Sequence, residues 1–518
     1  MEDGTALGRH NGGMPDPLHP VPRTGRPPRP PHRARARDVA QHDLRDIRAR
    51  LRGSIYEHVE PDRRAAAQYT AVQIVDFCLD VAEVMLASGA DTRSVEIALV
   101  AVATKWNLAP LELDFTGSSV TIQYAPAEGP ALVKMRTVRS DGSDLNRLAW
   151  ANQIVDDVIH DERDMTSAVS ALVAVLRMPS RWPSWVADVG LSILGTSIAM
   201  QASGGWRAGV GAFVLMLGII LSGRWLTNRG YPQFFVSGAQ GAVASVIGTL
   251  AIGAGVLQPA GAATMVAAIV VLLLPHVSLV TWAQDAISGF RAMAVARAFY
   301  IGLVIAAIVV GVPAGIAMTK WLHLEVDPSG IVTQTLPLWA SLSLTVVSAA
   351  ANCFVQQASA RVIPVAVVFS VTAAASLWGL RQLGLPLLGA TFLAAVLLGV
   401  LSTYAAVRMR TAVSAISVPA FCGALLPGVA VSNALLNFMS GTSSAALDFV
   451  AAVSVALGIG AGLVLGSLFA TPGARRALRR SRKVVVHSVH SDTTALRVIR
   501  DSGYDPGNGT VPRLPRTP

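Results

Sequence analysis

An uninterrupted run of 55 residues without a charged side chain, 230–284, constrains the fold of this chain more than any other feature. A helix needs about 20 apolar residues to cross the hydrocarbon core of a bilayer, so the run is long enough for two crossings. Within lipid the backbone polar groups have to be paired inside the chain, which favours helices as the spanning structures. From position 181 onward, similar windows with almost no charge predict ten spans in all. They lie at 182–206, 208–223, two within 230–284, 298–319, 337–354, 362–380, 386–407, 413–435 and 450–470.

The residues before position 181 are more polar, although the whole chain is 52% hydrophobic and only 14% charged. Residues 1–68 are rich in Pro, Arg and His and predict a disordered basic tail. Helical spacing of apolar residues from position 73 and strict alternation at 119–124 predict a small soluble α+β domain over 69–176. A basic tail, 473–518, follows the last span. The predicted fold class is a polytopic all-α membrane bundle with a small soluble N-terminal α+β domain.

The basic residues are distributed unevenly between alternate loops of the predicted membrane region. With the N-terminus inside, the cytoplasmic loops hold seven arginines, whereas the opposite loops hold three basic residues. This bias predicts that both termini are cytoplasmic. The net charge is +10, but the basic residues are nearly all Arg and cluster at the termini and at the ends of the apolar runs, which is the pattern of membrane orientation, so we expect no nucleic-acid partner. The three scattered cysteines show no CxxC spacing, and we expect neither a disulfide framework nor a metal site.

The two halves of the membrane region resemble each other. The pattern Leu-Leu-Pro-x-Val at 273–277 returns at 425–429, and the Ser-Gly pair at 288–289 returns at 440–441, both after 152 residues. The same shift carries the first predicted span onto the sixth and the fifth onto the tenth. Five spans in each half is an odd number, so the second copy has to enter the membrane from the opposite side. We therefore predict two inverted repeats, 181–320 and 334–472, as in several transporter folds.

In transporters of this kind, substrates bind where interrupted helices occupy matching positions in both halves. Pro275 and Pro427 are the predicted interruptions, because a proline inside a helix removes one backbone hydrogen bond. The candidate substrate and coupling residues are Pro275, His276, Ser278, Thr281, Asp285 and Gly289 in the first copy and Pro427, Gly428, Asn433, Asn437 and Gly441 in the second.

Asp285 aligns with Asn437, so only the first copy holds a side chain that can exchange a proton at this position. We predict that Asp285 is the coupling carboxylate; the alternative is a loop residue just outside the bilayer. Asp188 in the first span is a second candidate, since an ionisable group inside a span is costly unless it has a function. Its alternative interpretation is a side chain that reaches the interface beside Trp182 and Trp185.

Sequence motifs of enzymes are missing from the chain. No lysine follows a glycine, which excludes a Walker A loop, and no HExxH, GxSxG or protein-kinase pattern occurs. Ser88, Ser118 or Ser119 with His160 as a base would be the components of a hydrolase, but exposed loop serines are the simpler interpretation. We expect a transporter without a cofactor.

Residues 85–96 read Met-Leu-Ala-Ser-Gly-Ala-Asp-Thr-Arg-Ser-Val-Glu. This stretch, together with 137–139 and 144–152, resembles motifs in the N-terminal domain of the threonine/serine exporter family. The segment 275–297 resembles a second motif through Asp285, Gly289 and Arg297, and 426–428 resembles a third. His276 departs from the family, which usually has Gly there. The N-terminal motif residues are Ser88, Gly89, Ala90, Thr92, Glu96, Arg139, Asp144 and Asn152.

The resemblance implies a proton-driven antiporter in the bacterial cytoplasmic (inner) membrane that exports threonine, serine or a related small metabolite. Some relatives are linked to dicarboxylate export, so the substrate class extends to small carboxylates. The implied partners are this substrate, protons and membrane lipid, and the oligomeric state is open. Two alternatives from other classes are a membrane-anchored hydrolase with a catalytic N-terminal domain and a regulatory membrane protein that senses a ligand.

Overall fold

The structure is a computed structural model of the whole chain. By its contacts the chain divides into two compact units, 1–45 and 46–518, and all of the described residues belong to the second. The structure describes residues 50–51, 54–57, 59–62, 68–108, 111–126, 129–138, 142–203, 205–320, 336–425, 447 and 450–471.

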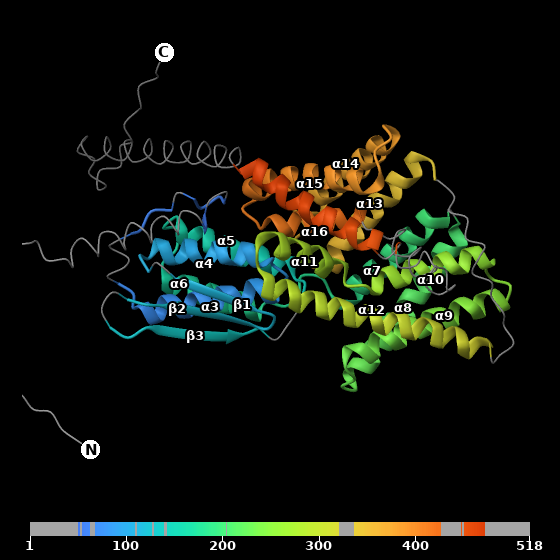
Figure 1. Cartoon of the computed structure of the whole chain (residues 1–518), viewed down its shortest axis with the longest axis horizontal. Helices are drawn as coiled ribbons and strands as arrows, with labels where there is room; N and C mark the ends of the chain where they lie inside the picture. Colours follow the sequence, from blue (N-terminus) through green and yellow to red (C-terminus); the bar gives the residue numbers. More distant parts are fainter. Residues whose placement is uncertain are drawn as a thin grey trace, which may run out of the picture. The chain divides into compact units, whose positions relative to one another are not determined.

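Residues 71–177, which we call the N-terminal region, combine four helices with one antiparallel sheet (Figure 1). The helices are α3 (Ala71–Ala87), α4 (Thr92–Lys105), α5 (Leu145–Ile159) and α6 (Met165–Arg177). The strands are β1 (Glu112–Thr116), β2 (Ser119–Tyr124) and β3 (Leu132–Thr137), in the order β1-β2-β3. The strand predicted from alternation at 119–124 is confirmed as β2, whose Val120 and Ile122 are fully buried.

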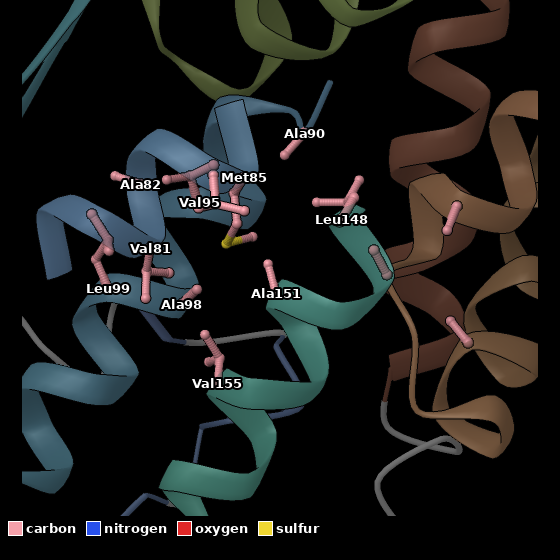
Figure 2. Packing of buried hydrophobic residues seen from close by; sticks show 14 of the residues in the cluster. Val81, Ala82, Met85, Ala90, Val95, Ala98, Leu99, Leu148, Ala151 and Val155 are labelled. Carbon is pink, nitrogen blue, oxygen red and sulfur yellow. The ribbon is translucent and has the colours of Figure 1, made fainter. Parts of the chain in front are cut away.

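The core of the N-terminal region lies between α3, α4 and α5 (Figure 2). Met85 of α3, Val95 and Leu99 of α4 and Leu148 of α5 point toward one another and are all fully buried. Helical spacing puts the apolar side chains of each helix on one face, which is why three separate segments share a single core.

The remaining helices are apolar, and most of them are long. They are α7 (Ser184–Ser203), α8 (Trp206–Asn228), α9 (Gln233–Gly253), α10 (Pro259–Leu273), α11 (His276–Ser288), α12 (Arg291–Lys320), α13 (Leu338–Val355), α14 (Ile363–Gln382), α15 (Leu387–Met409), α16 (Val413–Ala424) and the helix Val450–Thr471. We call this set the membrane helices. Several expose large apolar side chains, including Val214 (65%), Phe299 (73%) and Val310 (65%), as expected of surfaces that face lipid.

Within the described residues, seven helices are long and apolar enough to cross a membrane. The bent pair of α10 and α11 makes an eighth if the two helices form one broken span. Helix α7 is not among these candidates, and α16 is too short, with only 12 residues. The described residues therefore give seven or eight candidate spans, and ten stays a prediction.

The membrane helices make the same contacts in the same order in both halves of the chain. Helix α7 packs against α8 and α10, and α13 packs likewise against α14 and α16. Helix α9 contacts α8 and α10, and α15 contacts α14 and α16. The helix α12 lies along α9, and Val450–Thr471 lies along α15. This order is the one expected if each half is a copy of one five-span unit.

Glycines bring the last helix close to α15. A Cβ added at Gly462 would lie only 2.6 Å from the carbonyl oxygen of Phe392, and one at Gly466 would meet the backbone of Val396. The spacing of Gly458, Gly462 and Gly466 predicts such close helix packing, and at these two positions the prediction is confirmed.

Candidate functional site

The chain is interrupted at Pro275, as its sequence predicts. Helix α10 ends at Leu273 and α11 begins at His276, and the two helices are bent by 50°. The N–H of His276 donates to the carbonyl oxygen of Leu274 at 2.8 Å, which closes the tight turn between them. The corresponding Pro427 lies outside the described residues, as do Gly428, Asn433, Asn437 and Gly441.

Asp285 connects α11 to two other segments. Its carboxylate is 1% exposed and lies 2.8 Å from the guanidinium of Arg297 on α12. The backbone N–H of Thr92, the first residue of α4, donates to the other carboxylate oxygen at 3.2 Å. Gly289 ends α11 with a φ of 93°, a conformation that favours glycine, and so turns the chain into α12. Two sequence motifs 193 residues apart therefore meet at one carboxylate.

The other polar residues predicted on α11 make local contacts. The hydroxyl of Thr281 donates to the carbonyl oxygen of Val277, and Nδ1 of His276 lies 3.3 Å from that of Leu274. Ser278 is half-buried. On α7, Asp188 makes two contacts of 2.6 Å with the guanidinium of Arg224 from α8, so this carboxylate is engaged in an ion pair.

The N-terminal motif forms the corner between α3 and α4. Ser88 caps the C-terminal end of α3, and Gly89 follows with a φ of 91°, where a side chain would be strained. The Asp91 carboxylate then accepts a hydrogen bond from the N–H of Ser94 at 2.9 Å and caps α4. Farther along the chain, Asp144 caps α5 in the same way.

The remaining members of this motif have varied surroundings. Ala90 and Thr92 are buried, Glu96 is half-buried on α4, Asn152 is half-buried on α5, and Arg139 lies outside the described residues.

The N-terminal region is attached to the ends of the membrane helices through several contacts. Phe115 of β1 stacks edge to face on Phe290, with ring centroids 5.9 Å apart. The N–H of Leu145 donates to the carbonyl oxygen of Gln356 at 3.0 Å. Glu162 pairs with Arg410 at the end of α15, at 3.2 Å. These contacts join β1 to the turn between α11 and α12, and join α5 and Glu162 to the ends of α13 and α15. Helices α4 and α5 also pack against α11 and α16, respectively.

A cavity of about 200 Å³ lies where these helices meet. Its walls come from α4 and α5 of the N-terminal region and from α11, α15, α16 and the helix Val450–Thr471. Charged residues of both signs line it: Asp91, Arg93, Asp156 and Arg410. Hydroxyl and amide groups add to the lining: Ser94, Asn152, Gln284, Ser288, Thr403, Thr411, Ser414, Ser417, Ser467 and Thr471. A small cavity with convergent polar groups fits a metabolite of a few non-hydrogen atoms.

Two family models match the chain, one on each side of the segment 320–340. The first, "Putative threonine/serine exporter", matches residues 76–319, and the second, "Threonine/Serine exporter, ThrE", matches residues 341–469. Together they cover more than half of the chain and include the residues that line the cavity, apart from Ser54, Ile55, Tyr56 and Thr471. The chain belongs to the threonine/serine exporter family.

Two relatives of this exporter family align with the chain over long stretches. A "Probable threonine/serine exporter" of Mycobacterium tuberculosis is 29% identical over 410 residues, which is 77% of each chain. The "Threonine/serine exporter" of Corynebacterium glutamicum is 24% identical over 257 residues, 48% of this chain and 52% of that protein. No solved structure matches the chain. Family membership and the apolar helices together identify a multi-pass membrane protein.

In this member of the threonine/serine exporter family, the cavity and the residues predicted from its sequence overlap only in part. Asn152 is the one predicted site residue among those that line the cavity in the described residues. Asp285 is not in the lining, but its helix neighbours Gln284 and Ser288 are. Arg93 is a residue that sequence reasoning missed as a site candidate, although it lies inside the family motif. The sequence feature that points to it is a positively charged side chain two residues after Asp91, the residue that caps α4.

Proposed function

We propose that this protein is a secondary active transporter that exports threonine, serine or a related small metabolite, and that the cavity holds its substrate. The observation that carries this proposal is the lining of the cavity. An amino acid is a zwitterion, so its site needs groups of both charges, and a hydroxylated side chain needs hydrogen-bonding partners. The cavity provides both in a small volume bounded by membrane helices. The names of the two relatives support the same substrates.

The proposed architecture is a pair of inverted five-span repeats that alternate access to the cavity. The bend at Pro275 and the equal order of helix contacts in the two halves support it. The proposed location is the bacterial cytoplasmic membrane, with both termini in the cytoplasm. The uneven distribution of arginines supports this orientation, and under it the cavity, which lies beside the N-terminal region, is reached from the cytoplasm.

We assign the coupling of export to protons to Asp285. In its charged state the carboxylate holds Arg297 and the first N–H of α4. A proton on Asp285 would weaken both contacts, because a neutral acid attracts a guanidinium far less than a carboxylate does. Helix α4 carries Asp91 and Arg93 into the cavity, so the loss of these contacts is transmitted to the substrate site.

A hydrolase in the N-terminal region has less support. Ser88, in the corner after α3, lines a second cavity together with Glu83 and Arg136, but is itself only 2% exposed. The His160 ring is engaged with Asp156 of its own helix, at 3.1 Å from the carboxylate.

The test of the proposed function is threonine efflux from cells loaded with a threonine-containing peptide, with and without the gene. We expect the gene to raise efflux and an uncoupler to abolish the increase. Equal efflux with and without the gene would refute export of threonine, and a repeat with serine-containing and dicarboxylate substrates would then define the class. An increase that survives the uncoupler would refute proton coupling alone.

A further inference from the structure

We infer that Arg93 binds the carboxylate of the transported molecule, so that the cavity selects small molecules with a free carboxylate. The inference rests on the proposed function, since it assigns a role inside the same cavity. Its starting point is the difference between Arg93 and the three other charged residues of the lining.

Those three residues already have partners within the protein. The Asp91 carboxylate caps α4 through Ser94, as described above. The Asp156 carboxylate pairs with His160, and the Arg410 guanidinium pairs with Glu162. Each of the three thus has a hydrogen-bond or ion-pair partner within the protein.

Arg93 differs from them, because its guanidinium makes no hydrogen bond or ion pair in the part of the chain that the structure describes. The side chain is half-buried. A guanidinium carries five N–H donors in a planar fork, and those of Arg93 have no acceptor among the described residues. A carboxylate matches this fork with two parallel hydrogen bonds. A carboxylate on the transported molecule therefore supplies the hydrogen-bond acceptors that the protein does not.

The position of Arg93 in α4 makes it a suitable receptor. Its two neighbours along the helix have their N–H groups fixed, that of Thr92 by Asp285 and that of Ser94 by Asp91. The first turn of α4 is thus held in place from both sides. Because the backbone that carries Arg93 is already held in place, less conformational entropy is lost when the side chain binds a ligand, which favours affinity.

Unpaired hydroxyl groups face the same cavity from the membrane helices. The Oγ1 atom of Thr411 is buried without a hydrogen-bond partner among the described residues. Ser417 of α16 is only 5% exposed and also lines the cavity. When the carboxylate of the transported molecule is bound to Arg93, these hydroxyls can form hydrogen bonds with its ammonium group or with its side-chain hydroxyl. The transported molecule would then connect the N-terminal region to the membrane helices.

The experiment compares L-threonine with L-threoninamide, which has the same shape but no carboxylate charge. Binding of each is measured by calorimetry on the purified full-length protein, as wild type and as Arg93→Gln, Arg93→Lys and Arg177→Gln. Arg177 is an exposed arginine at the end of α6, outside the cavity, and serves as the matched control. We expect Arg93→Gln to weaken threonine binding by about 10- to 100-fold, the usual loss for one charged hydrogen-bonded contact, and to leave threoninamide binding unchanged.

The outcomes separate this inference from the proposed function. If Arg93→Gln keeps the wild-type preference for threonine over threoninamide, Arg93 does not bind the carboxylate, although export can stand. If it weakens both ligands equally, its role is structural and the inference is also wrong. Partial recovery of the preference in Arg93→Lys, with Arg177→Gln equal to wild type, supports the inference. If the wild type neither binds threonine nor raises its efflux, the proposed function fails first.

Discussion

Replacement of Asp285 by Asn tests whether the ion pair with Arg297 holds α11 and α12 together. Removal of one partner from a buried ion pair costs about 3–5 kcal/mol, because the other charge stays buried without compensation. The Asp285 carboxylate is 1% exposed, but the Arg297 side chain is 21% exposed, so water solvates part of the orphaned guanidinium. We therefore expect the free energy of unfolding to fall by about 3 kcal/mol, the lower end of that range. Asn has nearly the same shape as Asp and keeps an oxygen that accepts the hydrogen bond from the N–H of Thr92. The loss of stability therefore measures the effect of removing the negative charge.

The assay is equilibrium unfolding of the purified full-length protein in mixed micelles. Asp188→Asn is the matched control: it breaks an ion pair with Arg224, whose side chain is 47% exposed, and should cost less than about 1 kcal/mol. The double variant Asp285→Asn with Arg297→Gln removes both charges and should recover at least about 1 kcal/mol relative to the sum of the single losses. An Asp285→Asn loss no larger than that of the control, or losses that simply add, would refute the reasoning.

The same variants separate stability from coupling. If Asp285 carries the proton, Asp285→Asn inserts into the membrane but loses uncoupler-sensitive efflux, and the double variant stays inactive although it regains stability. Efflux that returns in the double variant would mean that the carboxylate serves structure alone. Normal efflux in Asp285→Asn together with its loss in Asp188→Asn would move the coupling role to α7, and normal efflux in both would exclude both carboxylates.

Three further predictions concern packing, thiol reactivity and topology. Gly462→Ala should destabilise the protein by about 1–3 kcal/mol through overpacking against α15, whereas Gly379→Ala, which has open space around it, should not; equal unfolding free energies would contradict the close packing. Burial raises the pKa of the Cys78 thiol to about 12, so the thiolate is absent at pH 8, and maleimide should label this residue only after unfolding; rapid labelling of the folded protein would disprove this. Cysteines introduced at Ser329 and Ser481, both outside the described residues, should be labelled from outside intact cells at 329 alone, and the reverse pattern would overturn the orientation.

Much of the architecture follows from local sequence patterns. The apolar windows predict where the membrane helices begin and end, because the length of an apolar run between charges depends on neighbouring residues only. The break at Pro275 follows in the same way from the missing N–H of proline, and the strand β2 follows from strict alternation. Close packing at Gly462 follows from the four-residue spacing of glycines on one helix face. The number of spans does not follow from this reasoning, since α10 and α11 share one apolar run but bend between them.

The composition of the site was decided by tertiary structure. The sequence singled out Asp285 as a polar residue after a helix break, but nothing local indicates that its partners are Arg297 and the backbone of Thr92. Likewise, the pair of Glu162 and Arg410 joins residues 248 positions apart. Helical periodicity predicts which residues share one face of a helix. It does not predict which other helix packs against that face. The sequence by itself thus determined the class of protein and the positions of its helices, because these depend on local hydrophobicity. Only the packing of α4 and α5 against the membrane helices decided that Arg93 lines a cavity, because that contact depends on the whole fold.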